Sequence, residues 1–353
     1  MRIKEMAQIF NGSTPSTSIS KYWDGSISWI TPKDLSLNRT RYISKGERNI
    51  TLEGYNSCST TMLPRETVLL TSRAPIGYVA ISRNELCTNQ GFKSLVCNKD
   101  KVLPLYLYYW LTTKTEFLKS ISTGATFKEL SKTTLEDVLI DLPELDEQRH
   151  IVDTIGSIDD LIENEQEKNK TLIALGTFKY ESIFRNSKVI PLGSLIKYIK
   201  GKKPVDGDSK NLRPYFSIEA LETGQSIQMS SDGVPCHGGD VLMVMDGASS
   251  GKVYLSENGF VGSTLAKLVS DSLPASVLYF GLSRFQDDIM ANTKGSAIPH
   301  ADKSYISELP LISQANDDEI DEFDNIISSL LVSRKKIALL KTQKQVLLNR
   351  YFK

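Results

Sequence analysis

Apolar positions along the chain follow two patterns, and these patterns alternate twice. Short apolar runs separated by turn residues fill residues 1–143 and 187–310, as expected for several short β-strands. The clearest runs are Val68–Leu70, Tyr78–Ile81, Val241–Val244 and Lys252–Leu255. In each of these stretches a proline introduces a predicted helix, over residues 105–118 in the first and 275–290 in the second.

Residues 144–186 and 311–353 have apolar positions at alternating steps of three and four and contain no proline. Such spacing is typical of a coiled-coil seam. The first seam comprises Ile151, Ile155, Ile158, Ile162, Leu172, Leu175 and Phe178; the second comprises Ile326, Leu330, Ser333, Ile337, Leu340, Lys344, Leu347 and Tyr351. A helix of about 38 residues is roughly 57 Å long. We therefore expect the two helices to pair antiparallel; two independent surface helices are the alternative.

An internal repeat relates the two halves of the chain. Matched positions are Gly12 with Gly201, Pro15 with Pro204, Trp29–Leu35 with Tyr215–Leu221, Arg73–Gly77 with Gly247–Gly251, and Gly124 with Gly295. The segments between these matches differ in length and content, which predicts two similar domains that recognise different things. The predicted fold is α+β, with globular domains at 1–143 and 187–310 related by a pseudo-twofold axis and joined by long antiparallel coiled-coil helices at 144–186 and 311–353.

Charge is distributed unevenly although the 353 residues sum to zero net charge. Residues 1–143 contain 18 Lys and Arg against 13 Asp and Glu, whereas residues 144–186 contain 5 against 10. Residues 188–213 again carry an excess of basic side chains. A basic front on each repeat favours a polyanionic partner, and solvated charge without a partner is the alternative.

No apolar run reaches the 18 or more residues that a membrane span requires. The first residues are polar and charged, so we expect no secretory signal and a cytoplasmic location. The four cysteines have neither the density nor the spacing of a disulfide framework or a zinc site, and we expect ordinary packed thiols.

Several blocks of the first repeat, in order, closely resemble a target recognition domain in the specificity subunit of type I restriction-modification enzymes. They are Gly12–Thr17, Tyr22–Gly25, Ile27–Leu35, Thr71–Gly77, Thr88–Lys93 and Gly124–Ser131, and Leu142–Arg149 resembles the start of that family's helical spacer. The second repeat departs from the pattern where Ile312-Ser313 replaces the Glu-Gln-Arg signature, which leaves the start of the second helix open.

The resemblance implies a non-catalytic subunit. Each domain would recognise one half of a split target in double-stranded DNA, and the helices would set the gap and dock two adenine-N6 methyltransferase subunits. S-adenosylmethionine, ATP and Mg would be bound by those subunits and by restriction/translocase subunits, with no cofactor on this chain and no membrane partner. The chain has no Asn-Pro-Pro-Tyr or Asp-Pro-Pro-Tyr stretch to form an adenine methyltransferase pocket.

DNA contact needs basic side chains for phosphate and guanine, amides for adenine, and hydroxyls for positioning. Candidates on predicted loops are Thr14, Ser16, Thr31, Lys33, Arg73, Asn89, Gln90, Thr126, Lys128, Lys202, Lys203, Arg213, Ser217, Lys252, Ser263, Lys294 and Lys303. Trp29 and Tyr215 are candidates for stacking, although a place in the core is favoured. His300 occupies the place of Glu129, and a DNA contact there is as well supported as a plain loop role.

Two enzymatic alternatives have weak support in the sequence. Gly247–Lys252 resembles a phosphate loop, but it is one residue short and lacks the Ser or Thr after the lysine. Asp208 and Lys210 form an Asp-x-Lys with no preceding partner carboxylate, and the scattered histidines predict no metal site. A stand-alone nuclease or NTPase and a scaffold that bridges two proteins without contacting DNA are the rival functions.

Overall fold

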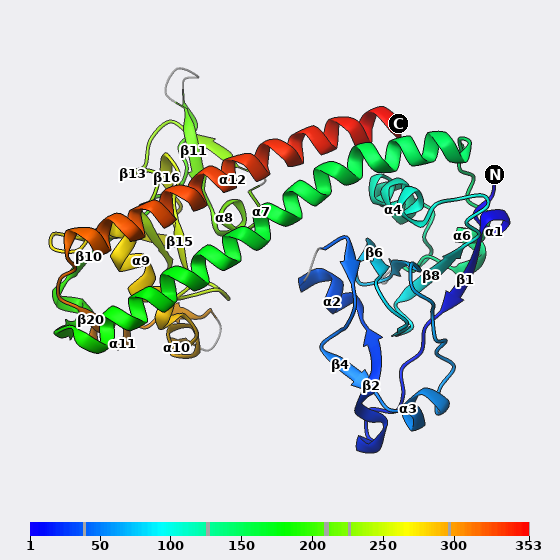
Figure 1. Ribbon diagram of the computed structural model, residues 1–353, viewed down its shortest axis with the longest axis horizontal. Helices are drawn as coiled ribbons and strands as arrows, with labels where there is room; N and C mark the ends of the chain where they lie inside the picture. Colours follow the sequence, from blue (N-terminus) through cyan, green and yellow to red (C-terminus); the bar gives the residue numbers. More distant parts are fainter. Residues whose placement is uncertain (38–39, 125–127, 208–211, 225–226, 296–297, 353) are drawn as a thin grey trace. The chain divides into compact units, whose positions relative to one another are not determined.

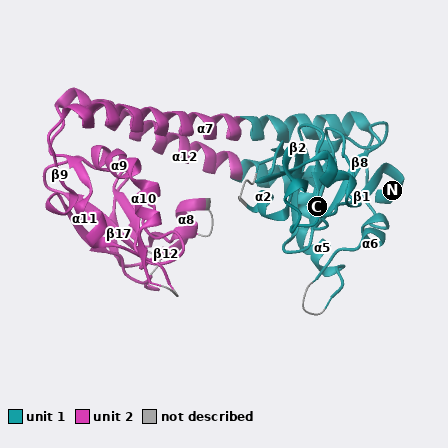
Figure 2. Cartoon of the chain, turned by 90° about the horizontal axis from the view of Figure 1, so that it is seen from below, with its two compact units in different colours: residues 1–160, 342–353 teal, residues 161–341 magenta. Residues whose placement is uncertain are grey.

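The computed structural model describes residues 1–352 except 38–39, 125–127, 208–211, 225–226 and 296–297. The chain folds into two compact units, which are coloured separately in Figure 2. Unit 1 comprises residues 1–160 and 342–353, and unit 2 comprises residues 161–341. Among the described residues, none of the helices combines the length and apolar character that crossing a membrane requires.

Unit 1 contains a five-stranded sheet and a three-stranded sheet. The larger has the order β1-β8-β5-β6-β3, and the smaller has the order β4-β2-β7. The strands are β1 (Ala7–Asn11), β2 (Trp23–Ile30), β3 (Tyr42–Ile43), β4 (Arg48–Ile50), β5 (Val68–Ser72), β6 (Ile76–Ser82), β7 (Cys87–Thr88) and β8 (Phe92–Cys97). The helices before the spacer are α1 (Ile3–Met6), η1 (Ser20–Tyr22), α2 (Pro32–Leu37), α3 (Leu52–Asn56), α4 (Pro104–Thr113), α5 (Thr115–Ser120) and α6 (Lys132–Glu136).

Unit 2 contains two four-stranded sheets, with the orders β10-β17-β14-β15 and β12-β11-β16-β13, and the two-stranded pairs β18-β19 and β20-β9. The strands are β9 (Val189–Pro191), β10 (Ile196–Lys200), β11 (Arg213–Phe216), β12 (Gln228–Ser230), β13 (Val234–Cys236), β14 (Val241–Val244), β15 (Val253–Leu255), β16 (Gly259–Val261), β17 (Leu265–Ser270), β18 (Thr293–Lys294), β19 (His300–Ala301) and β20 (Pro310–Ile312). Its shorter helices are η2 (Leu192–Ser194), α8 (Ile218–Thr223), α9 (Ala275–Arg284), α10 (Gln286–Ala291) and α11 (Lys303–Glu308).

The two units repeat one topology, which confirms the internal repeat. The order β1-β8-β5-β6 in unit 1 corresponds to β10-β17-β14-β15 in unit 2, and all these neighbours are antiparallel. In the smaller sheets β2 pairs parallel with β7, as β11 pairs parallel with β16. The apolar runs predicted as strands form β5, β6, β14 and β15.

Matched glycines occupy matched environments. A Cβ on Gly12 would lie 2.1 Å from the Asn89 carbonyl oxygen, and one on Gly201 would lie 2.2 Å from the Gly262 carbonyl oxygen. Both positions exclude a side chain, because the backbone at the end of the parallel strand, β7 in unit 1 and β16 in unit 2, passes directly beside the glycine. Gly77 and Gly251 have φ angles of +100° and +90°, a region that favours glycine.

The long helices α7 (Leu145–Asn186) and α12 (Asp317–Tyr351) run side by side (Figure 1). Their contacts within each unit show that they are antiparallel, because partners of rising number in α7 have falling numbers in α12. In unit 1 the His150 ring lies against the Tyr351 ring and Asp159 pairs with Lys344, and in unit 2 Glu165 pairs with Lys336 and Lys179 with Glu322. The 42 residues of α7 correspond to about 63 Å of helix.

The seam predicted for α12 is confirmed, since all its positions are buried or half-buried. The seam predicted for the first half of α7 is also confirmed, but its continuation through Leu175 and Phe178 is wrong: these side chains are 43% and 74% exposed. The buried face instead includes Gly176 and Tyr180. A Cβ on Gly176 would lie 2.2 Å from Phe280, so the glycine makes room for an aromatic ring of α9.

Each helix predicted after a proline is divided in two. The first breaks at Lys114, between α4 and α5, and the second breaks at Phe285, between α9 and α10. The break redirects the second segment onto the glycine turn: Thr115 contacts Gly77, and Gln286 donates to the Gly251 carbonyl at 3.0 Å. Periodicity does not reveal this change of direction.

The second long helix begins at Asp317, later than the expected residue 311, because residues 310–312 form β20 against β9. Asn316 then starts the helix through reciprocal bonds: its Oδ1 accepts from Glu319 N at 2.9 Å, and Glu319 Oε2 accepts from Asn316 N at 2.9 Å. This capping box satisfies amide groups that a helix start leaves unpaired.

Candidate nucleic-acid interface

Three loops of unit 1 converge where β1, β2 and β7 end. Ser13 N donates to the Thr88 carbonyl at 3.0 Å, and Asn89 N donates to the Ile30 carbonyl at 3.0 Å. The Thr14 hydroxyl donates to Gln90 Oε1, which joins two candidate side chains directly. Three further candidates belong to the same loops: Ser16, Thr31 and Asn89. The structure therefore brings these polar groups together. The spacing of the residues in the sequence does not by itself show that they are neighbours.

Some of these side chains are engaged within the protein. The Thr31 hydroxyl and amide both donate to Asp34 Oδ2 at 2.7 Å, and Asp34 is 4% exposed. Lys33 is exposed and pairs with Glu47 at 2.6 Å, which raises the pKa of the lysine. Asn89 Oδ1 accepts from Gly91 N at 2.9 Å. Thr31 and Asn89 thus shape the loops, whereas Thr14, Ser16, Lys33 and Gln90 face solvent at least in part.

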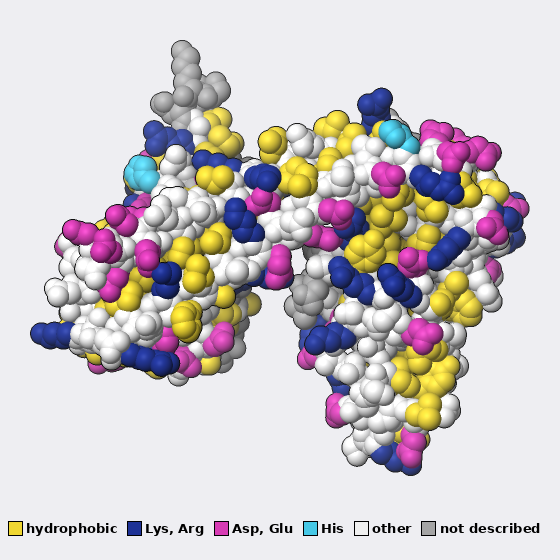
Figure 3. All heavy atoms as spheres, viewed as in Figure 1, with side chains coloured by type: hydrophobic (Ala, Val, Ile, Leu, Met, Phe, Trp, Pro, Cys, Tyr) yellow, Lys and Arg dark blue, Asp and Glu magenta, His cyan; other side chains and the backbone are white. Residues whose placement is uncertain are grey.

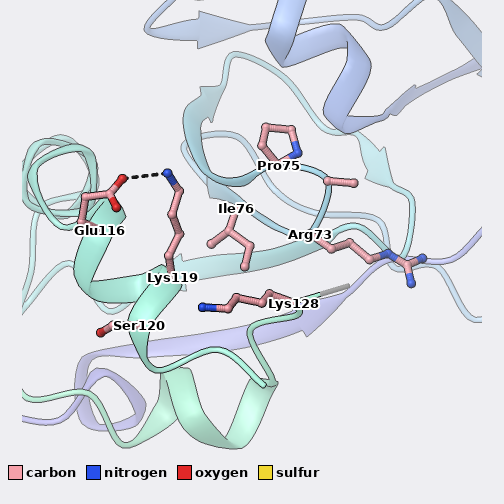
Figure 4. Close-up of a pocket in the computed structure, with 8 residues that line it drawn as sticks. Arg73, Pro75, Ile76, Glu116, Lys119, Ser120 and Lys128 are labelled. Atoms are coloured by element: carbon pink, nitrogen blue, oxygen red, sulfur yellow. Dashed lines mark hydrogen bonds and ion pairs between the residues drawn. The ribbon is translucent and has the colours of Figure 1, made fainter. Parts of the chain in front are cut away.

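Arg73 and Lys128 both line an open pocket of about 820 Å³ (Figure 4). Ala74, Pro75 and Ile76 contribute apolar wall, and Lys119 of α5 adds a cation that sequence reasoning missed. The Lys119 ammonium is held by Glu116 at 2.7 Å, whereas Lys128 has no ion-pair partner among the described residues. Figure 4 shows the Lys128 ammonium directed toward α5 and the Arg73 guanidinium directed away from it.

The loop of unit 2 that contains Gly201 corresponds to the Gly12 loop of unit 1 and has similar backbone contacts. Lys202, next to Gly201, forms a bridge with Gly262, and Ser263 N donates to the Tyr215 hydroxyl at 2.8 Å. Ser217 caps α8 by accepting from Ala220 N at 3.1 Å, so its hydroxyl is occupied within the protein. Lys202 is exposed beside this loop.

The remaining basic candidates of unit 2 are spread over several elements. Arg213 is exposed on β11 near the Phe260 ring, and Lys203 is exposed without an ion-pair partner in the part of the chain that the structure describes. Lys252 pairs with Glu222 at 3.0 Å, and Tyr254 also donates to Glu222 at 2.7 Å. Burial raises the pKa of Glu222, but these two hydrogen bonds outweigh it and lower the pKa overall.

A second open pocket, of about 380 Å³, lies beside the end of β14 in unit 2. Asp246 is held by two groups there: His300 Nδ1 lies 2.8 Å from Oδ1, and Lys200 Nζ lies 3.0 Å from Oδ2. Burial raises the pKa of Asp246, but these partners lower it overall. Two candidate lysines, Lys294 and Lys303, also line this pocket. Lys294 pairs with Asp302 at 2.8 Å, and Lys303 lies over the Tyr198 ring.

Trp29 and Tyr215 are 5% and 7% exposed, which confirms that they are core aromatics. The Trp29 indole N–H donates to the Ser13 carbonyl at 3.0 Å and so supports the candidate loop from beneath. Thr126 lies outside the described residues. Sequence reasoning did not single out Asp246, which lines the second pocket and follows directly after a buried apolar run.

The enzymatic alternatives gain no support from the geometry. The segment Gly247–Lys252 leads into strand β15 instead of a helix, and its Gly247 amide donates to the Pro299 carbonyl at 2.9 Å. A phosphate loop needs free amides at a helix start. Asp208 and Lys210 lie outside the described residues. No group of three or more metal-ligating side chains occurs among the residues with described positions.

Figure 3 shows basic side chains interspersed with acidic and apolar ones on the visible face, with no single continuous basic patch. The four cysteines are free, and burial raises the pKa of Cys87 and Cys236 to about 11. The Cys87 and Cys236 thiols are therefore protonated near neutral pH and poorly suited to metal binding or nucleophilic chemistry.

Comparison with known proteins identifies the fold and the sequence pattern. Residues 1–174 match the family model described as Type I restriction modification DNA specificity domain. The chain is 46% identical over 227 residues to the type I restriction enzyme MjaIX specificity subunit of Methanocaldococcus jannaschii, which covers 62% of this chain and 51% of that one. It is 30% identical over 182 residues to the MjaVIII specificity subunit of the same organism, with 47% and 41% covered.

Among solved structures, the fold resembles the type I restriction-modification S subunit from M. genitalium. The TM-score is 0.58 at 16% identity, and the match covers 99% of this chain and 94% of that one. The two β-rich units with packed long helices therefore define a specificity-subunit fold. Residues 1–174, almost half of the chain, therefore belong to the family of type I restriction-modification DNA specificity domains, and the chain as a whole has the fold of a specificity (S) subunit. The chain spans about half the length of the curated relatives that it matches.

Proposed function

We propose that this chain is the non-catalytic DNA-recognition subunit of a type I restriction-modification complex. Residues 1–143 and 187–310 would act as two target recognition domains, each contacting one half of a bipartite site in double-stranded DNA. The observation that supports this most directly is the repeated topology with matched glycine loops and different side chains on them. Two domains with the same fold and different surface side chains are suited to recognising two different half-sites.

The paired helices α7 and α12 would set the gap between the half-sites and dock two adenine-N6 methyltransferase subunits. Restriction/translocase subunits would join the same complex. S-adenosylmethionine, ATP and Mg would be bound by those partners, with no cofactor on this chain. The family assignment and the antiparallel pairing of α7 with α12 support this part of the proposal.

Salt-dependent binding tests the proposal against a scaffold that never contacts DNA. The affinity of the purified chain for duplex DNA should fall steeply with salt, because each neutralised phosphate releases counterions. Replacing exposed Lys202 and Lys203 by alanine should reduce the slope of log affinity against log salt by about 1 for each phosphate that is no longer neutralised. The exposed Lys170→Ala variant on α7 is the control and should keep the slope.

Mapping methylated adenines in a host that expresses the complete system gives the second test. The expected result is one bipartite motif with two different half-sites and a fixed gap. Binding that ignores salt, together with no methylation motif that depends on this chain, would refute the recognition role.

A further inference from the structure

Equivalent ends of β5 in unit 1 and β14 in unit 2 are held by the same backbone contacts. Leu130 N donates to the Ser72 carbonyl at 2.9 Å, and Ala301 N donates to the Met245 carbonyl at 2.9 Å. These bonds make Arg73 the structural equivalent of Asp246. The sequence match of Arg73 with Gly247 is therefore displaced by one residue, because the turn that follows β14 is one residue longer.

The residues opposite these positions are equivalent as well. Glu129 N donates to the Thr123 carbonyl at 2.8 Å, and His300 pairs with Lys294 in the same antiparallel manner. This confirms that His300 occupies the place of Glu129. Each unit thus presents one pair of facing side chains on a shared backbone arrangement: Arg73 with Glu129, and Asp246 with His300.

The polarity of the pair is reversed between the units. In unit 1 the carboxylate is Glu129, which lies 3.7 Å from Arg73 Nη1 and 3.5 Å from Lys93 Nζ. In unit 2 the carboxylate comes from the other member, Asp246, held by His300 and Lys200. The strand end therefore offers hydrogen-bond donors in unit 1 and acceptors in unit 2, while the backbone bonds are unchanged.

Both strand ends are accessible to a ligand. Arg73 is 40% exposed and lines the larger pocket, whereas the Asp246 and His300 side chains are 29% and 53% exposed and line the smaller one. Arg73 has five N–H donors and only long contacts to Glu129, and the Asp246 carboxylate has lone pairs beyond its two partners. Each therefore retains hydrogen-bonding capacity for a base edge.

We propose that these two pairs are specificity-determining positions, at which Arg73 recognises a guanine in one half-site and Asp246 recognises a cytosine in the other. This inference rests on the proposed function. Arginine matches the two major-groove acceptors of guanine, and a carboxylate accepts from the cytosine amino group. Glu129 and His300 are positioning residues that hold the reading side chain.

The test exchanges the pairs within the complete system and maps methylated adenines. The unit 1 variant is Arg73→Asp with Glu129→His, and the unit 2 variant is Asp246→Arg with His300→Glu. Each should change the preference at one base position of one half-site by roughly 5- to 150-fold, from guanine toward cytosine or the reverse, and leave the other half-site intact. The control exchanges Lys21 and Glu53, an exposed pair of unit 1 at 3.0 Å, and should keep the wild-type motif.

Active exchange variants that keep the wild-type base at every position would overturn the proposal. If an exchanged complex does not methylate, Arg73→Lys decides the matter, because it keeps the charge and loses the planar fork. It should relax the guanine position, and an unchanged motif in this variant would equally overturn the inference. Failure of the proposed function is separate: the wild-type system would then produce no bipartite motif at all.

Discussion

Removing the ammonium of Lys344 should destabilise unit 1 through a buried carboxylate. Asp159 on α7 has a side chain only 8% exposed, and it accepts from Lys344 Nζ at 2.7 Å and from the Tyr109 hydroxyl at 2.8 Å. Lys344→Met fills a similar volume but leaves the Tyr109 hydroxyl as the one hydrogen-bond donor to the Asp159 carboxylate among the described residues. Removing one partner of a buried pair costs about 3–5 kcal/mol. The Tyr109 bond remains, so we expect the lower end, about 3 kcal/mol.

Tryptophan fluorescence measures this change in unit 1 alone, because the three tryptophans, Trp23, Trp29 and Trp110, all belong to that unit. With a urea m-value of roughly 2 kcal/mol/M, a loss of about 3 kcal/mol lowers the unfolding midpoint by about 1.5 M. The matched control is Lys132→Met, which removes a half-exposed i,i+4 pair with Glu136 and should change the free energy of unfolding by about 0.5 kcal/mol or less.

A double substitution separates charge burial from packing. Asp159→Leu combined with Lys344→Met removes both charges, so the pair should cost less than Lys344→Met alone. The reasoning is refuted if Lys344→Met changes the unfolding free energy no more than Lys132→Met does, or if the double variant is the sum of its two single variants.

Two further substitutions test local packing. Gly12→Ala places a Cβ against the Asn89 carbonyl and should cost about 2–3 kcal/mol by tryptophan fluorescence, whereas Gly156→Ala in α7 meets only ordinary contacts from 3.6 Å and should stabilise by about 0.5–1 kcal/mol. Tyr215→Phe removes the acceptor of the Ser263 amide and should cost about 1 kcal/mol. Calorimetry detects that loss in unit 2, and an unchanged transition would contradict it.

The repeat could be predicted from the sequence because its markers are backbone requirements. Gly12 and Gly201 stand where a neighbouring strand excludes any side chain, so they remain matched although the loops around them differ. The α12 seam was predictable for a related reason, because burial along a long helix repeats with the helical period. Neither the matched glycines nor the helical period depends on which distant residue contacts these positions in the folded chain.

Partners between distant segments could not be predicted. Ser333 and Lys344 interrupt the apolar seam of α12, and their acidic partners Glu165 and Asp159 lie on α7 more than 160 residues away. Which acid faces each one depends on the register of two helices, and each helix alone leaves that register open. The seam predicted for the second half of α7 failed for the same reason. Gly176 lies on the buried face because the aromatic ring that packs against it comes from α9, a distant segment of the chain.

The candidate interface was likewise predictable only in part: the sequence identified loop residues, but it did not identify their contacts. Sequence spacing identified the loop residues Thr14 and Gln90, but their direct contact appears only when the ends of β1 and β7 meet. Several candidates proved to be occupied within the protein, such as Ser217 at the start of α8. A hydroxyl suits a helix cap and a phosphate equally well, so residue type alone does not distinguish the two roles.

Separating backbone requirements from side-chain chemistry explains how one fold can serve two different half-sites. The glycine positions and the backbone bonds donated by Leu130 and Ala301 help to fix the strand ends, and they do not depend on which side chains stand at residues 73 and 246. Side chains at those ends are then free to differ, even to the reversed polarity of Arg73 and Asp246, without loss of the fold. If recognition depended on the shared backbone instead, exchanging these pairs would leave the methylated bases unchanged.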